Sequence, residues 1–216
     1  MWDWDFALQI LPDLLRASLI TMQATVLGMS LAVVLGLLWA LLRRARRRLI
    51  AVTTAWSVEF IRSTPLLVQI YFLFFILPDF GIRLSPLTTG ILALGLHYSA
   101  YTSEVYRAGI ESVPNGQWEA ALALNMSPTH MWLAVILPQA IPPVIPALGN
   151  YLVAMFKDTP MLAAITVLEL LQTAKLIGAA TFRYLEPLTL VGLLFLAISL
   201  LASRFIHKLE ARFGSR

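Results

Sequence analysis

The sequence predicts an all-α integral membrane protein with five transmembrane helices, an external N-terminus and a cytoplasmic C-terminus. Hydrophobic residues make up 59% of the 216 positions and charged residues only 13%, which leaves too little polar surface to cover a soluble globule. Basic residues gather beside the apolar runs, where they act as topology signals. Membrane topology therefore explains the net charge of +4, and we expect a lipid bilayer and no nucleic acid as partner.

The first predicted span covers residues 17–42, which make a helix of about 39 Å, enough to cross a hydrocarbon core of about 30 Å. The preceding start, MWDWDF, lacks the basic region of a signal peptide, so we expect no cleaved leader. Small and polar residues of this span are expected to face other helices, because they let helices approach closely. These residues are Thr21, Gln23, Thr25, Gly28, Ser30 and Gly36.

A cluster of arginines follows the first span. It consists of Arg43, Arg44, Arg46, Arg47 and Arg48. By the positive-inside rule this loop lies in the cytoplasm and the N-terminus lies outside. A binding site for anionic lipid is the alternative interpretation of the same cluster.

The second predicted span, residues 56–78, is expected to be bent. Glu59 and Arg62 lie three residues apart, so they can form a structural charge pair on one helix face. Thr64 and Pro65 have the pattern of an N-cap followed by a first helical residue, which indicates a restart or a kink. The span then ends in a short external loop at a turn signal formed by Pro78, Asp79 and Gly81.

The third predicted span, residues 87–111, ends in a ladder of charges. Glu104, Arg107 and Glu111 stand at helical spacings of three and four, so Glu104 and Arg107 form a second structural charge pair. One interpretation is that these charges anchor the helix end near the lipid headgroups. The other is that they act as a lever that joins the span to the following loop.

Residues 141–172 form an apolar stretch that is too long for one ordinary span and is broken near residues 157–160. Lys157, Asp158, Thr159 and Pro160 stand at this break. Charged residues at bilayer depth usually line a pathway or pair with each other, and discontinuous helices occur at substrate sites of transporters. Lys157, Asp158 and Thr159 are therefore candidate pathway residues, with a structural ion pair as the alternative. Glu169 is a further pathway candidate.

The rest of the chain is predicted to hold an external loop at residues 175–184 and a last span at residues 188–206. Arg204 and Lys208 then place the C-terminus in the cytoplasm. No separate soluble domain has room, so residues 1–216 form a single transmembrane domain.

The loop at residues 112–138 is too polar to cross the membrane, because unpaired polar groups in hydrocarbon cost several kcal/mol, roughly. Its sequence predicts two short helices from Gln117 onward. Asn125 suits the left-handed conformation at a helix C-terminus, and Ser127 and Pro128 suit an N-cap and a first helical position. The result is a compact amphipathic unit that fits a groove on another protein.

Several residues of this loop resemble the EAA loop of permease subunits from binding-protein-dependent ABC importers. They are Gly116, Glu119, Ala120, Ala121, Asn125, Leu137 and Pro138. The family pattern has Gly where this chain has Asn125 and Ile where it has Val135, and both substitutes keep the physical role. The stretches EFIRSTPLLVQIYF, SAYTSEVYRAGIESVPNGQWEAA and PALGNYLVAMFKDT are similar to the polar amino acid permease branch, including its ectoine permeases. The similarity runs through nearly the whole chain.

The resemblance implies the fold of an ABC type I importer permease in the cell inner membrane. It implies an ABC ATPase dimer docked on the loop at residues 112–138, which we call the docking loop. It also implies a second permease subunit, in a homodimer or a heterodimer, and an extracytoplasmic solute-binding protein. The chain itself has no phosphate-binding Gly-Lys-Ser/Thr motif, so ATP and magnesium belong to the partner ATPase and this chain binds no cofactor. The implied substrate is an amino acid or a compatible solute such as ectoine or hydroxyectoine.

Two other classes of function are open to a chain of this composition. An ion-coupled or passive carrier would cross the membrane in the same way without an ATPase partner. An intramembrane hydrolase would need a nucleophile and a base, for which Ser30 and His97 are the candidates. The three histidines are isolated in the sequence and there is no cysteine, so we expect no metal site.

Overall fold

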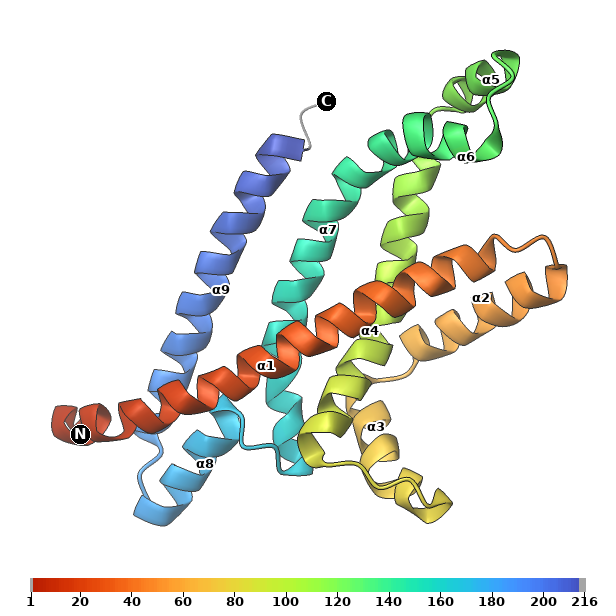
Figure 1. Cartoon of the computed structure of the whole chain (residues 1–216). Coiled ribbons are helices and arrows are strands. Elements are labelled where there is room, and N and C mark those ends of the chain that lie inside the picture. The colour runs from red at the N-terminus through yellow and green to blue at the C-terminus, as the bar shows by residue number, and fades with distance from the viewer. Residues whose placement is uncertain (1, 214–216) are drawn as a thin grey trace.

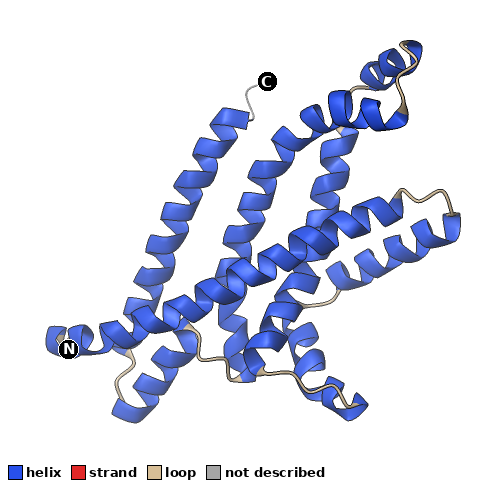
Figure 2. Cartoon of the chain, in the orientation of Figure 1, coloured by secondary structure: helices blue, strands red, loops and turns tan. Residues whose placement is uncertain are grey.

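The computed structural model describes residues 2–213, and within that range it contains helices and loops but no strand (Figure 2). Short π and 3₁₀ segments continue several of the α-helices, at 72–76, 77–80, 132–136 and 159–165. The α-helices are α1 (Trp4–Arg43), α2 (Arg48–Ser63), α3 (Leu66–Tyr71), α4 (Pro86–Glu111), α5 (Asn115–Ala123), α6 (Pro128–Met131), α7 (Leu137–Asp158), α8 (Leu170–Thr181) and α9 (Leu185–Phe213).

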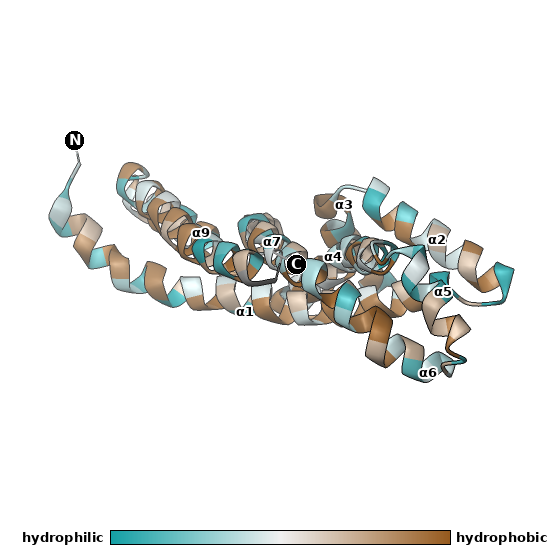
Figure 3. Ribbon diagram, turned by 90° about the horizontal axis from the view of Figure 1, so that it is seen from above, coloured by the Kyte–Doolittle hydropathy of each residue, from teal (hydrophilic) through white to brown (hydrophobic). Residues whose placement is uncertain are grey.

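Helices α4, α7 and α9 stand side by side, and α1 crosses one face of this row (Figures 1 and 3). Helix α2 turns back along the C-terminal half of α1. The short helices α5 and α6 project from one end of the molecule, whereas α3 and α8 lie at the opposite end (Figure 1). The predicted docking loop is thus separated from the helix breaks by the length of the long helices.

Close packing of α1 against α4 is the main contact of the fold. Thr102 on α4 donates a hydrogen bond to the backbone carbonyl of Ala32 at 2.8 Å, and the indole of Trp39 donates to Ser99 at 3.0 Å. Such contacts need a small residue between the helices, and Gly36 supplies it. A Cβ at Gly36 would meet the hydroxyl of Thr102 and would lie 2.9 Å from the Ser99 carbonyl.

The predicted buried face of the first span is only partly correct. Thr21, Thr25, Gly28 and Gly36 are buried as predicted. Gln23 and Ser30 are exposed, so their prediction was wrong. Ser30 shows the reason, because its hydroxyl donates to the carbonyl of Val26 on its own helix at 2.8 Å. A serine that satisfies its hydroxyl in this way needs no neighbouring helix.

The bend predicted at Thr64 and Pro65 is present. Helices α2 and α3 meet there at 102°. Pro65 is the N-cap of α3 and Leu66 its first residue, so the helix starts one position later than predicted. The Gln69 amide stabilises the bend by donating to the carbonyl of Ile61 at 2.8 Å and to the Thr64 hydroxyl at 2.7 Å.

At the predicted position, near residues 157–160, the helix changes from α to 3₁₀, but the helical stretch continues to Ile165 and ends at Thr166, where φ is 64°. The predicted loop at 175–184 was wrong, because α8 continues to Thr181. Glu169 starts α8 as its N-cap and accepts hydrogen bonds from the backbone of Leu171 and Gln172, at 2.9 and 2.7 Å. The polar residues that suggested a loop lie on a short helix beside α1 and α9.

The N-terminal ends of α1 and α9 are joined by polar contacts. Arg183 lies 3.2 Å from the carboxylate of Asp3 and 2.8 Å from that of Glu186. Asp3 is also the N-cap of α1. The hydrogen bond from the Phe6 backbone and the Arg183 guanidinium hold the pKa of Asp3 below its usual value.

By length and composition, three or four stretches of the described residues qualify as membrane crossings, against the predicted five. Within residues 2–213, three helical stretches are long and apolar enough to cross a membrane: Trp4–Arg43, Pro128–Ile165 and Leu185–Ala211. The bent pair Arg48–Ser63 and Leu66–Phe80 makes a fourth if it counts as one crossing. Helix α4 is about 39 Å long but carries buried polar residues on much of its surface.

We expect Gly36→Ala to lower the free energy of unfolding by about 1–3 kcal/mol, because the added Cβ pushes α1 away from Thr102 and Ser99. The melting temperature should fall accordingly. The matched control is Gly192→Ala in α9, where a Cβ would meet nothing within 4 Å. That change should be neutral or should stabilise the helix by up to about 1 kcal/mol. Thermal unfolding of both variants in detergent checks this, and equal melting temperatures would contradict the assigned contact.

Candidate functional site

The first helix of the predicted docking loop, residues 112–138, is α5. It starts at Asn115, so it includes Asn115 and Gly116, which were predicted to form a turn. The helix ends as predicted, since Asn125 has the left-handed conformation with φ of 51°. The Met126 N–H donates to the Ala121 carbonyl at 3.1 Å and the Asn125 N–H to the Leu122 carbonyl at 2.9 Å. This hydrogen-bond pattern is the Schellman motif, which stops a helix sharply.

The second half of the loop begins with Ser127, whose hydroxyl accepts a hydrogen bond from the His130 N–H, and with Pro128 as first residue of α6. Ser127 as N-cap and Pro128 as first helical residue were both predicted from the sequence. The expectation of a second short, separate helix was wrong. Helix α6 continues through the π segment Trp132–Ile136 directly into α7, which begins at Leu137 with Pro138 in its first turn.

Two tryptophans hold the loop together. Trp118 on α5 and Trp132 meet edge to face, with ring centroids 5.3 Å apart. Both pack on a small apolar core around Val113 and Ile136. The guanidinium of Arg44 lies 5.6 Å from the centre of the Trp132 ring, so the arginine-rich end of α1 also contacts this unit. The loop is therefore a folded unit that packs on the end of α4.

The outer surface of this unit is exposed and has no partner within the described residues. Glu119 makes no ion pair or hydrogen bond there, and Ala120 is exposed beside it. Large apolar side chains accompany them, namely Leu122, Leu124 and Leu133. Gly116 is open on all sides, whereas Ala121 is buried inside the unit. This surface of the unit therefore combines one acidic side chain with several exposed apolar ones.

A cluster of aromatic rings lies beside the helix break, and the sequence analysis missed it. The Tyr98 hydroxyl donates to the Asp158 carboxylate at 2.6 Å. Ring centroids in the cluster lie 5.2 to 6.1 Å apart. The cluster consists of His97, Tyr98 and Tyr101 from α4 and Tyr151 from α7. Tyr98 and Tyr101, three apart on one helix, were the available signal.

The four predicted pathway residues differ in their surroundings. Asp158 is half-buried and faces this cluster, whereas Lys157 is exposed, and within residues 2–213 no ion pair involves either residue. The alternative of a structural Lys157–Asp158 ion pair is therefore wrong. Thr159, the first residue of the 3₁₀ segment, is buried and donates a hydrogen bond to the carbonyl of Phe156 in α7. Glu169 is fully buried as the cap of α8, so only Asp158 among the four contacts the aromatic cluster.

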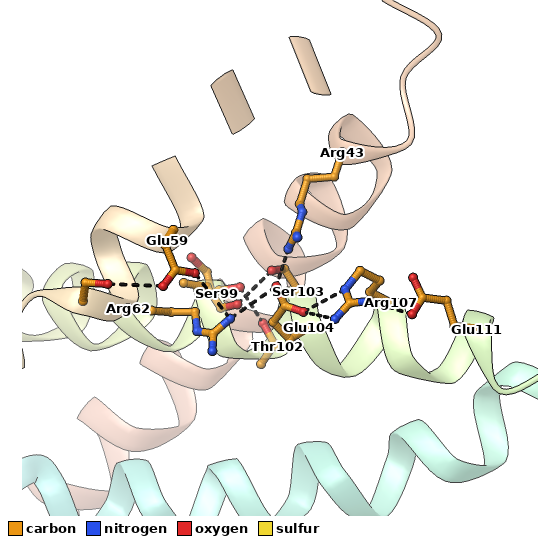
Figure 4. A network of polar contacts seen from close by, with 11 residues as sticks. Arg43, Glu59, Arg62, Ser99, Thr102, Ser103, Glu104, Arg107 and Glu111 are labelled. Atoms are coloured by element: carbon orange, nitrogen blue, oxygen red, sulfur yellow. Dashed lines mark hydrogen bonds and ion pairs between the residues drawn. The ribbon is translucent and has the colours of Figure 1, made fainter. Parts of the chain in front are cut away.

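The two predicted charge pairs are part of a larger network (Figure 4). Arg62 lies 3.9 Å from Glu59 on its own helix, and Arg107 lies 2.7 Å from Glu104 and 2.6 Å from Glu111. The carboxylate of Glu104 also forms ion pairs with Arg43 of α1 and Arg62 of α2. The sequence pattern shows the contacts along one helix but not those between helices.

The described residues contain no group of histidine, aspartate and glutamate side chains that could hold a metal ion. The hydrolase alternative also lacks its geometry. Ser30 bonds to its own helix, and His97 contacts the side chain of Gln69 at 3.3 Å. No nucleophile and base therefore meet at these two positions.

Comparison with known proteins assigns the chain to a family. The model of the family described as binding-protein-dependent transport system inner membrane component matches residues 32–215. The chain is 49% identical over 211 residues to the probable amino-acid ABC transporter permease protein y4tG of Sinorhizobium fredii, covering 98% of this chain and 91% of the relative. It is 35% identical to the L-cystine transport system permease protein TcyB of Bacillus subtilis, covering 97% and 90%.

A solved structure shows the same fold. A crystal structure described as an amino acid ABC transporter with histidines superposes with a TM-score of 0.94 at 32% identity, covering 98% of this chain and 99% of that one. The arrangement of the long helices and of the projecting loop is thus the arrangement of an ABC permease. The chain belongs to the family of binding-protein-dependent transport system inner membrane components.

Proposed function

We propose that this chain is the permease subunit of an ATP-driven importer that takes up an amino acid across the inner membrane. The exposed unit formed by α5 and α6 carries the proposal, because a folded projection with Glu119 among exposed leucines needs a partner with a complementary groove. The relatives reported above are named for amino acids, so we favour an amino acid over a compatible solute.

The proposed partner at this surface is the ATPase dimer, which binds ATP and magnesium and supplies the energy. Each ATPase subunit would grip the region around Glu119 and Ala120, with Leu137 and Pro138 forming the root of the projection on α7. The Schellman motif at Asn125 and the paired tryptophans support this role, because a stiff unit transmits a push that a flexible loop would absorb.

The remaining partners are a second permease subunit and an extracytoplasmic solute-binding protein. The many large apolar side chains exposed on α1, α3 and α9 are available to lipid and to a neighbouring permease. The path would then lie between the two permeases, and the solute-binding protein would deliver the substrate on the external side.

Asp158 and the tyrosine cluster are the proposed contact for the ammonium group of the amino acid. A carboxylate beside several aromatic rings attracts a cation through charge and through the ring faces. Lys157, exposed at the next position, is proposed to meet the substrate carboxylate. Thr159 and Glu169 are proposed to shape the break in the helix around these two residues.

The proposed energy source of uptake is ATP, not an ion gradient. With the ATPase and the binding protein reconstituted in liposomes, amino-acid uptake should need internal ATP and should persist when the ion gradients are collapsed. Uptake that follows the ion gradients and ignores ATP would support an ion-coupled carrier and contradict the proposal. Radiolabelled amino acids, with ectoine as a competitor, also show which substrate class the assembly prefers.

Glu119→Lys should reduce ATP-driven uptake at least about tenfold, because reversing a charge at an interface commonly costs 1.4 kcal/mol or more. Asp79→Lys, an exposed reversal at the opposite end of the molecule, is the matched control and should leave uptake unchanged. Co-purification with the ATPase is measured in parallel. Normal uptake and normal ATPase binding in the Glu119 variant would remove the loop from this role.

Asp158→Asn should raise the half-saturating substrate concentration roughly 10- to 100-fold, because a hydrogen bond to a charged group contributes about 1.5–3 kcal/mol. The amide keeps an acceptor for Tyr98, so assembly and thermal stability should stay near the wild-type values. Lys157→Ala should weaken the binding of substrates that carry a carboxylate. It should leave the binding of their amide derivatives unchanged. Loss of folding without any change in substrate dependence would make Asp158 a structural residue.

A further inference from the structure

Glu104 is the point at which three helices are joined by charge. Its Oε1 contacts Arg43 of α1 and lies 3.3 Å from Arg62 of α2, and its Oε2 lies 2.7 Å from Arg107 of its own helix (Figure 4). The Glu104 side chain is only 21% exposed. Within residues 2–213, every ion pair that joins α1, α2 or α4 to another of these helices involves this carboxylate.

The neighbouring acids cannot replace Glu104. Glu59 contacts Arg62 at 3.9 Å on the same helix and its side chain is 61% exposed. Glu111 contacts only Arg107, again on its own helix. Without Glu104, Arg43 would lose its acidic partner, and Arg62 and Arg107 would keep only the acids on their own helices, so no opposite charge would join the three helices.

Helix α2 depends on this carboxylate more than α1 does. The α1–α4 contact is also held by the close approach at Gly36 and by the hydrogen bond from Thr102 to Ala32. Helix α2 instead rests on a small apolar cluster around Val58 and Ile61. The ion pair between Arg62 and Glu104 is therefore a larger share of the contacts that hold α2 against α4.

Arg62 also reaches the aromatic cluster. Its guanidinium lies 5.6 Å from the centre of the Tyr101 ring, and Tyr101 stacks near Tyr98, which binds Asp158. The Nε of Arg62 is buried without a hydrogen-bond partner. Arg62 thus lies between Glu104 and the aromatic cluster and contacts both.

On its C-terminal side, α4 continues from Glu104 to Glu111. It then leads into the docking unit, the folded part of the docking loop with α5 and α6, in which Val113 is buried. Arg44, next to Arg43, lies over Trp132 of the same unit. A displacement of the docking unit therefore acts on α4 and on the end of α1 together.

We propose that Glu104 is a positioning residue that, through Arg62, makes α2, the bend that follows it and the tyrosine cluster follow the movement of the docking loop. The inference rests on the proposed function, in which an ATPase moves that loop. Glu104 touches no substrate in this role. It converts a push on α5 into a displacement of Tyr101 and of the bend at Thr64.

The test uses the full complex with its ATPase and binding protein. Glu104→Gln and Arg62→Gln should each lower the number of amino acids imported per ATP hydrolysed by about fivefold or more, the usual range of coupling between sites. ATPase binding and basal ATP hydrolysis should stay unchanged. Glu104→Asp, which keeps the charge, should restore much of the ratio, and Glu111→Gln, which removes only a contact within one helix, should leave it unchanged.

A distance measurement separates this inference from the proposed function. The sequence contains no cysteine, so spin labels at Ser57→Cys on α2 and Ser112→Cys after α4 would be the only labels on the subunit. The distance distribution should be narrow and unaffected by nucleotide in the wild-type background, and broad in the Glu104→Gln and Arg62→Gln backgrounds. This readout needs no substrate, so it stays informative if the assigned substrate class fails.

Two outcomes would overturn the proposal. One is an unchanged import ratio in both variants, and the other is a narrow label distance that neither substitution broadens. If Glu104→Gln does not assemble, Arg62→Gln decides alone, because it removes the tie to α2 and leaves the contacts of Glu104 with Arg43 and Arg107 in place.

Discussion

Polar groups inside a membrane protein must find partners within the protein, and α4 is the helix on which this constraint acts most strongly. Its buried hydroxyls on Ser99 and Thr102 reach α1 only because the two backbones approach closely at Gly36. The close approach is thus both a packing feature and the means by which polar residues are tolerated. It holds α4 against α1, and α4 also contacts α7, α2 and α3.

A central, firmly held helix can serve several parts of the molecule at once. Along α4 the chain places Tyr98 at the helix break, Glu104 at the junction with α1 and α2, and Val113 just beyond its end in the docking unit. Side chains on one rigid helix keep their spacing when the helix moves. This fixed spacing is the physical basis of the proposed coupling between the docking loop and the aromatic cluster.

The features that the sequence predicts well are those that depend on neighbours in the chain. Asn125, Ser127 and the bend at Pro65 follow from backbone preferences within a few residues. Contacts between distant residues leave no such pattern, which is why the tie from Arg43 to Glu104 and the ring cluster with Tyr151 were not predicted. Helix α8 was missed for a related reason, because its polar residues resembled a loop until neighbouring helices covered its apolar side.

Lys157 and Asp158 show how helix geometry separates neighbouring charges. Adjacent residues on a helix point about 100° apart, so their side chains do not face each other. Asp158 turns toward Tyr98, a neutral donor, and Lys157 turns outward. The hydrogen bond orients the carboxylate without cancelling its charge, and the described residues supply no ion pair that does so. The proposed contact with the ammonium group of an amino acid rests on this arrangement, a partly buried carboxylate beside aromatic rings that the described residues leave without an ion pair.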